Sequence, residues 1–229
     1  MNRSISLARP KEISWGWRYL AFQITFFEYF LGFAVRFFGL SWTALQLNLV
    51  YFGINLAATL VIFHRFWAES WKAALDRIGT ILLTAATGYV VYYIFSFLVS
   101  AFIVTVNPGF ANVNDQSISS LTKQHHVLTA IGTVLLVPTA EELLHRGAIF
   151  GGLYRRNRIA AYVVSTILFA LVHISGYIGY YPTGTLLLCL LQYIPAGICL
   201  AASYEYSGNI VTPILIHTAV NAVGMLAMR

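Results

Sequence analysis

Acidic and basic side chains lie close together inside an otherwise apolar stretch, residues 134–154 (VLLVPTAEELLHRGAIFGGLY). Glu141 and Glu142 are adjacent, and Arg146 follows four residues later. An ionisable residue at the centre of a membrane-spanning helix costs roughly 2.5–3.5 kcal/mol on insertion scales, so such residues usually serve a functional site. A carboxylate positioned beside other polar groups suits acid–base chemistry. We therefore expect a polar cavity, and a reaction, inside a membrane protein.

Helical spacing sets the neighbours of these residues. Side chains four residues apart share one helix face, so Glu142 is expected over Arg146 and Glu141 over His145. For His145 we expect a role in orienting its neighbours or in helix packing. Pro138 lies just before the carboxylates and has no backbone N–H, so a kink is expected there.

Two later apolar segments carry further polar residues at the same spacing. His173 follows Phe169 by four residues, and Asn221 follows His217 by four. At about 1.5 Å of helix per residue, both pairs reach depths that overlap with Glu141 near the middle of a membrane roughly 30 Å thick. One site is therefore expected to gather Glu141, Glu142, Arg146, His173, His217 and Asn221.

The composition is that of a membrane protein. Of the 229 residues, 59% are hydrophobic and 10% are charged, whereas about 25% are charged in a soluble domain. The formal charge of +6 comes from basic residues at the ends of apolar segments, so the expected partner is the lipid bilayer and not nucleic acid. We predict an all-α, polytopic transmembrane helix bundle of about seven spans: 19–38, 42–64, 78–106, 127–153, 159–174, 183–203 and 210–228.

The segments between the spans differ in character. Residues 65–77 are short, charged and aromatic, which is typical of an interfacial helix. Residues 107–124 form the longest polar stretch and are predicted to be a loop. The first apolar segment carries Gln23 and Glu28 and lacks a small-residue cleavage site, so it is expected to remain as a span.

The positions of lysine and arginine predict the orientation. Basic residues precede the first span, follow the second and follow the fourth: Arg3, Arg9, Lys11, Arg18, Arg65, Lys72, Arg77, Arg155, Arg156 and Arg158. The opposite ends of the spans carry only Arg36, Lys123 and Arg229. The positive-inside rule then places the N-terminus in the cytoplasm and the C-terminus outside.

Three short motifs carry a resemblance to a known family. EELLHR matches the EExxxR motif of the CPBP intramembrane proteases, FALVH matches their FxxxH motif, and HTAVN matches their HxxxN motif. The family includes the CAAX-processing endopeptidase of eukaryotes and the bacterial Abi proteins linked to bacteriocin self-immunity. The resemblance covers roughly residues 125–225. We therefore expect N-terminal spans and the interfacial helix over 1–124, and a catalytic core over 125–229.

The resemblance implies a role for each motif residue. Glu141, with His173, would activate water, and His217 and Asn221 would hold the oxyanion. Arg146 can keep Glu142 or Glu141 ionised and oriented. The implied activity is a glutamate-dependent endopeptidase in a bacterial cell membrane, cutting a hydrophobic peptide or a membrane-anchored protein. The short Abi proteins further suggest bacteriocin or pheromone maturation, or self-immunity.

Rival interpretations stay open at this stage. Two histidines and a carboxylate are a common zinc set, although the HExxH signature of zinc peptidases is absent. We favour the route without a metal or other cofactor. A non-catalytic scaffold that binds a partner protein is the second alternative, although a scaffold need not keep buried charges. A transporter is the third, but the first half of the chain does not mirror the motifs of the second.

Overall fold

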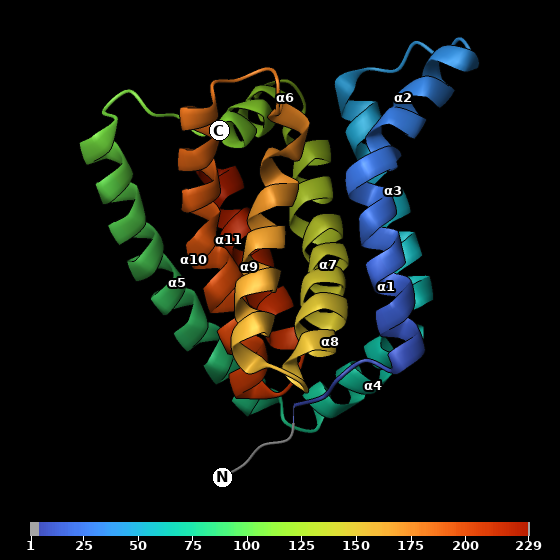
Figure 1. Cartoon of the computed structure of the whole chain (residues 1–229), viewed down its shortest axis with the longest axis vertical. Coiled ribbons are helices and arrows are strands. Elements are labelled where there is room, and N and C mark those ends of the chain that lie inside the picture. The colour runs from blue at the N-terminus through green and yellow to red at the C-terminus, as the bar shows by residue number, and fades with distance from the viewer. Residues whose placement is uncertain (1–4, 229) are drawn as a thin grey trace.

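Helices follow one another along almost the whole chain in the computed structural model, which describes residues 5–228 (Figure 1). Arg3 and Arg229 lie outside the described residues, as does the side chain of Glu28. No β-strand occurs within 5–228, so the predicted all-α fold is confirmed. The elements are α1 (Pro10–Phe22), η1 (Gln23–Phe27), α2 (Glu28–Phe37), α3 (Ala44–Ile62), α4 (His64–Leu75), α5 (Ile78–Val106), α6 (Val113–Ala130), η2 (Ile131–Leu136), α7 (Val137–Glu142), η3 (Leu143–Phe150), α8 (Gly151–Tyr154), α9 (Arg158–Ile174), η4 (Ser175–Tyr177), α10 (Thr183–Ser207) and α11 (Val211–Ala227).

Several of these helices are long and apolar enough to cross a membrane. Five meet that requirement within the described residues: Ala44–Ile62, Ile78–Val106, Val113–Tyr154, Arg158–Tyr177 and Thr183–Ser207. A sixth span results if the pair Pro10–Phe27 and Tyr29–Phe37, bent by 53°, counts as one. The apolar helix Val211–Ala227 has 17 residues and is shorter than the others. Each of the seven predicted spans thus coincides with a helix or a bent pair, and the number that crosses the bilayer stays a prediction.

The first helix begins earlier than predicted, at Pro10 and not at residue 19. Proline suits the first helical turn because the N–H that it lacks would have no partner there. Glu12 Oε2 accepts a hydrogen bond from the N–H of Arg9 at 2.8 Å, and its Oε1 accepts one from the N–H of Phe66 at 3.0 Å. The same carboxylate therefore starts α1 and fastens it to α4.

The predicted loop 107–124 is wrong over most of its length, because α6 begins at Val113. The Asn112 side chain accepts hydrogen bonds from the N–H groups of Asn114 and Asp115, which caps the helix. The backbone leaves helical geometry at His125, with φ −146° and ψ 59°. The span predicted to start at residue 127 therefore begins just after a kink, and a polar helix precedes it.

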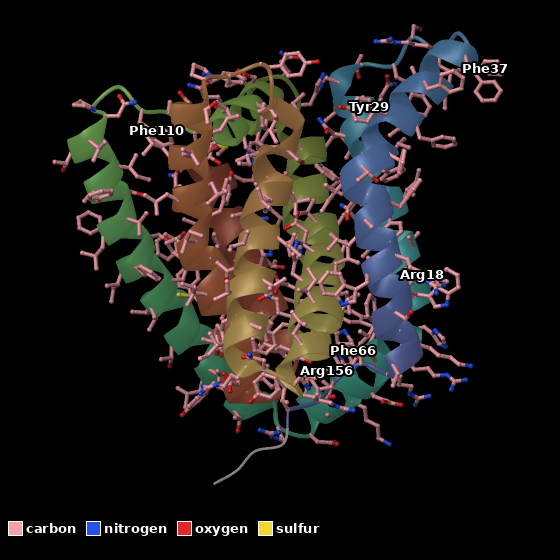
Figure 2. All side chains as sticks on the ribbon, in the orientation of Figure 1. Arg18, Tyr29, Phe37, Phe66, Phe110 and Arg156 are labelled. Atoms are coloured by element: carbon pink, nitrogen blue, oxygen red, sulfur yellow. The ribbon has the colours of Figure 1, made fainter. Side chains whose placement is uncertain are left out.

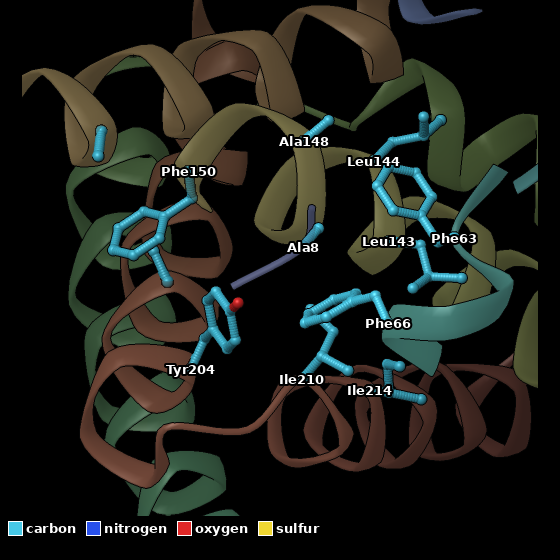
Figure 3. Packing of buried hydrophobic residues seen from close by; sticks show 12 residues of the cluster. Ala8, Phe63, Phe66, Leu143, Leu144, Ala148, Phe150, Tyr204, Ile210 and Ile214 are labelled. Atoms are coloured by element: carbon cyan, nitrogen blue, oxygen red, sulfur yellow. The ribbon is translucent and has the colours of Figure 1, made fainter. Parts of the chain in front are cut away.

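The principal core joins the first residues of the chain to its last third. Figure 3 shows Phe63 and Phe66 packed with Leu143, Ile210 and other buried apolar side chains. Helix α4 lies across the end of the bundle (Figure 1), and its buried residues recur every four positions: Phe66, Ser70 and Ala74. A helix at 65–77 is thus confirmed for most of its length, while its position at the membrane interface stays a prediction.

Burial separates the central helices from the peripheral ones. In the most apolar window of Val113–Tyr154, 44% of the residues are buried, against 6% for α5. Apolar side chains cover the outside of the bundle, whereas nitrogen-bearing side chains gather toward the end that holds Arg156 (Figure 2). The chain is an integral membrane protein whose charged centre lies in its most enclosed segment.

Candidate active site

The segment that carries the carboxylates is irregular because of Pro138. Short α7 lies between the π-helical turns η2 and η3. The N–H of Val137 bonds to the carbonyl of Gly132, five residues earlier, as in a π-helix. In the same pattern, the N–H of residue 138 would bond to the carbonyl of Thr133. Proline has no N–H to give. The Asn221 Nδ2 of α11 donates to the Thr133 carbonyl instead, at 2.8 Å. The irregularity beside Pro138 is therefore a π-helical turn whose unpaired carbonyl is satisfied from another span.

Arg146 and Glu142 form the expected pair one helical turn apart. Arg146 Nη1 lies 3.1 Å from Glu142 Oε1, and both side chains are completely buried. Arg146 Nη2 also donates to the carbonyl of Gly197 at 3.1 Å. The guanidinium lies over the Phe169 ring, 4.8 Å from its centroid. Arg146 thus joins η3 to α9 and α10 while it balances a buried carboxylate.

His217 of α11 shares the same carboxylate oxygen. Its Nδ1 lies 2.9 Å from Glu142 Oε1, so this oxygen accepts hydrogen bonds from both His217 and Arg146. The bond fixes the orientation of the imidazole ring. The other ring nitrogen, Nε2, then faces Glu141, with Oε2 at 3.9 Å.

His173 of α9 is the second imidazole near the Glu141 carboxylate. Its Nδ1 donates to the carbonyl of Phe169 at 2.8 Å, because a carbonyl oxygen can only accept. Its Nε2 therefore faces Glu141 Oε2, at 3.8 Å. The ring packs against Tyr193, with the centroids 4.2 Å apart. Both imidazoles thus present Nε2 to one carboxylate oxygen, at distances longer than a direct hydrogen bond.

The structure brings together the polar groups that the sequence predicted to converge. Asn221 lies beside the site, yet one of its amide hydrogens is used by Thr133. His145 does not contact the Glu141 carboxylate: its Nδ1 donates to the Glu141 backbone carbonyl at 2.9 Å. Its buried ring packs edge-on against Phe169 with centroids 5.3 Å apart, which fits the helix-packing role.

A cavity of about 650 Å³ opens on this cluster. Volumes of about 300–1,000 Å³ are usual for sites that bind small molecules. One part of the lining includes Glu141, His173, His217 and Asn221. Another part comes from η1 and α3, and it includes polar residues that we did not propose for the site: Gln23, Asn48, Tyr51 and Asn55. Gln23, Asn48 and Asn55 could have been found from the sequence, because they are amides inside predicted apolar spans.

Comparison with known proteins gives two informative matches. Residues 123–223 match the family described as type II CAAX prenyl endopeptidase Rce1-like. The UPF0177 protein YxdF of Lactococcus lactis subsp. lactis (strain IL1403) is 28% identical over 163 residues, which cover 70% of this chain and 81% of the relative. The matched region contains all three motifs and every residue of the polar cluster.

The chain is thus similar to the CPBP family, and at family level this similarity supports a CAAX-type intramembrane protease. The matched region begins at residue 123, after Gln23, Tyr51 and Asn55, so the part of the cavity that these three residues line lies outside it. No solved structure matches the chain significantly.

The side chains around Glu141 include histidine and carboxylate groups, which are common zinc ligands. Among the side chains that the structure describes, no group of three or more His, Cys, Asp or Glu residues is arranged to hold a metal ion. In the cluster, Glu142 holds Nδ1 of His217, and both histidines present Nε2 to a single oxygen of Glu141. The route without a metal therefore stays a proposal.

Proposed function

We propose that this chain is a glutamate-dependent endopeptidase that hydrolyses a peptide bond of a hydrophobic peptide or membrane-anchored protein inside the bilayer. One observation carries the proposal: Glu141 Oε2 faces Nε2 of His173 at 3.8 Å and Nε2 of His217 at 3.9 Å, beside the cavity. This oxygen has no hydrogen-bond partner among the described groups. A water molecule between these atoms would lie within reach of all three.

In the proposed reaction, Glu141 removes a proton from water while His173 Nε2 orients it. The water oxygen bonds to the carbonyl carbon of the substrate, and the carbonyl oxygen becomes an oxyanion. A protonated His217 donates from Nε2 to that oxyanion, while its Nδ1–H stays on Glu142. The second amide hydrogen of Asn221 is the other proposed donor. The C–N bond then breaks, and Glu141 returns the proton to the leaving amine.

Arg146 and Glu142 do not contact the reacting atoms in this scheme and act through His217. Glu142 holds the His217 ring in position, and Arg146 holds Glu142. Both charges are fully buried, so a change in either partner alters the orientation of His217. We therefore assign them positioning roles.

The decisive test is hydrolysis of apolar peptides by purified wild type and by Glu141→Gln. The amide cannot act as a base, and loss of a general base typically lowers the rate by about 10²–10⁴-fold. Glu69→Gln is the matched control, because Glu69 is an exposed residue in the middle of α4 and the substitution removes the same charge. Activity of Glu141→Gln within threefold of wild type, in correctly folded protein, would refute the assignment.

The proposal also states that no metal is required. We expect hydrolysis to survive strong chelators, and the purified protein to hold no stoichiometric zinc. Elemental analysis and activity after chelation are the measurements. One zinc per chain, with activity lost on chelation and restored by zinc, would replace this mechanism with a metal-dependent one.

The biological setting is proposed as a bacterial cell membrane, with the N-terminus in the cytoplasm. The relative from Lactococcus lactis supports a bacterial source, and the resemblance to Abi proteins supports bacteriocin or pheromone maturation, or self-immunity. Comparing membrane and secreted peptides from cells with wild type or Glu141→Gln would identify the substrate. Identical peptide profiles would contradict a processing role in those cells.

A further inference from the structure

A chain of hydrogen bonds crosses the first two apolar segments. The Tyr19 hydroxyl donates to Asn55 Oδ1 at 2.7 Å, and Asn55 Nδ2 donates to the Tyr51 carbonyl at 2.9 Å. Gln23 Nε2 donates to the Tyr51 hydroxyl at 3.1 Å. These bonds join α1 and η1 to α3, and the bond to the Tyr51 carbonyl fixes the orientation of the Asn55 amide.

The Gln23 amide at one end of this chain of bonds has an oxygen that accepts no hydrogen bond within the described structure. Gln23 Oε1 is buried and has no hydrogen-bond partner among the described groups. The Gln23 side chain is only 9% exposed, and it lines the same cavity as Glu141 and His173. A buried carbonyl oxygen without a partner is unfavourable, and its presence in a native protein calls for an explanation.

Hydrolysis inside a bilayer requires hydrogen-bond partners for the substrate backbone, and this oxygen can accept one such bond. A helical substrate keeps its backbone N–H and C=O groups bonded to one another, and the segment to be cut must unwind before water can attack it. Unwinding frees backbone groups that lipid cannot satisfy. The enzyme must therefore supply partners near Glu141, from elements that line the cavity.

We propose that Gln23 Oε1 accepts a main-chain N–H of the extended substrate segment and so positions that segment against Glu141. The inference rests on the proposed peptidase function and adds a substrate-binding residue from the first half of the chain. Gln23 lies outside the region that matches the family, residues 123–223. The N-terminal spans are therefore part of the substrate site and not only a support for it.

The test uses quenched fluorescent decapeptides with an apolar centre of Leu, Val and Ala, in detergent micelles. The peptide that wild type cleaves best is resynthesised with each backbone amide N-methylated in turn. We expect Gln23→Met, which keeps the side-chain length, to raise KM about three- to tenfold, the range for one hydrogen bond, with kcat within twofold. At one position, N-methylation should remove the N–H that Gln23 accepts. It should then raise the KM of wild type about three- to tenfold and leave the KM of Gln23→Met unchanged.

The matched control is Thr25→Val, two residues along the same π-helical turn. Thr25 is exposed and bonds only to the Ala21 carbonyl, so its KM should equal that of wild type. If Gln23→Met does not fold, Gln23→Asn replaces it, because the shorter amide remains polar but withdraws its oxygen and should raise KM likewise. Two results would overturn this inference and leave the proposed function standing. One is a KM of Gln23→Met equal to that of wild type, and the other is an equal rise in KM on N-methylation for both proteins. Failure of wild type to cleave any of the peptides would overturn the proposed function together with it.

Discussion

Arg146 supplies the counter-charge on which the buried carboxylate depends. Its pair with Glu142 is fully buried, and Glu142 also holds His217. Removing one partner of such a pair leaves an uncompensated charge, at a cost of roughly 3–5 kcal/mol. We therefore expect Arg146→Ala to lower both the unfolding temperature in detergent and the rate of hydrolysis, and Arg146→Ala/Glu142→Ala to unfold at a higher temperature than the single variant.

The control for this prediction is Arg158→Ala. Arg158 pairs with Glu205, but 68% of its side chain is exposed. An exposed ion pair contributes only about 0–1 kcal/mol, so this variant should unfold near the wild-type temperature. An Arg146→Ala protein as stable as wild type would show that the arginine does not serve as the counter-charge.

At the scale of single residues, the sequence predicted what local spacing determines. The contact of Glu142 with Arg146 follows from helical periodicity, as does the placement of His217 and Asn221 on one face. The bond from Asn221 to the Thr133 carbonyl could not be predicted, because it depends on a π-helical register that ends at Pro138. The Gln23 contacts were also missed, since they join different spans.

At the scale of elements, the break at Pro138 and the amide of Asn221 should depend on each other. Asn221→Leu leaves the Thr133 carbonyl without its partner, which costs about 1–3 kcal/mol for a buried group. Pro138→Ala restores an N–H that can reach this carbonyl. We expect Asn221→Leu to lower the unfolding temperature clearly in the wild-type background and much less in the Pro138→Ala background.

Thermal unfolding of the four proteins completes this double-mutant cycle. Equal losses in both backgrounds would show that the proline does not create the need for Asn221. Hydrolysis is measured in parallel. If Asn221 also serves the oxyanion, Asn221→Leu/Pro138→Ala should regain stability without regaining activity.

Element boundaries were predicted least well where polar helices meet apolar ones. Residues 113–124 were predicted as a loop from their composition, yet the Asn112 side chain caps a helix there and α6 packs against α3, α9 and α11. Tertiary packing thus stabilises a segment that composition alone assigns to solvent. The helix at 65–77 was recognised, because its aromatic and basic pattern is local.

At the scale of the whole molecule, the predicted orientation requires the basic loops to lie at one end of the bundle. Figure 1 shows α4 and the turn between α8 and α9 at the end where α1 begins, and the α5–α6 connection at the opposite end. In a Cys189→Ala/Cys199→Ala background, we expect Gln116→Cys to react with an impermeant thiol reagent from outside intact cells, and Arg156→Cys only after lysis. Labelling of both from outside would reverse or reject the topology.

Ser6, near the start of the described residues, forms its hydrogen bonds late in synthesis, because its partners lie far along the chain. Ser6 accepts a hydrogen bond from the Tyr204 hydroxyl, 198 residues later in the sequence, and its N–H bonds to the carbonyl of Gly208. A ribosome adds about 5–20 residues per second, so the N-terminal segment must wait about 10–40 s before its neighbours have been synthesised. During that time each span enters the membrane while this end of the bundle is still open. Closure of this end of the bundle therefore comes only after the ribosome has passed Gly208.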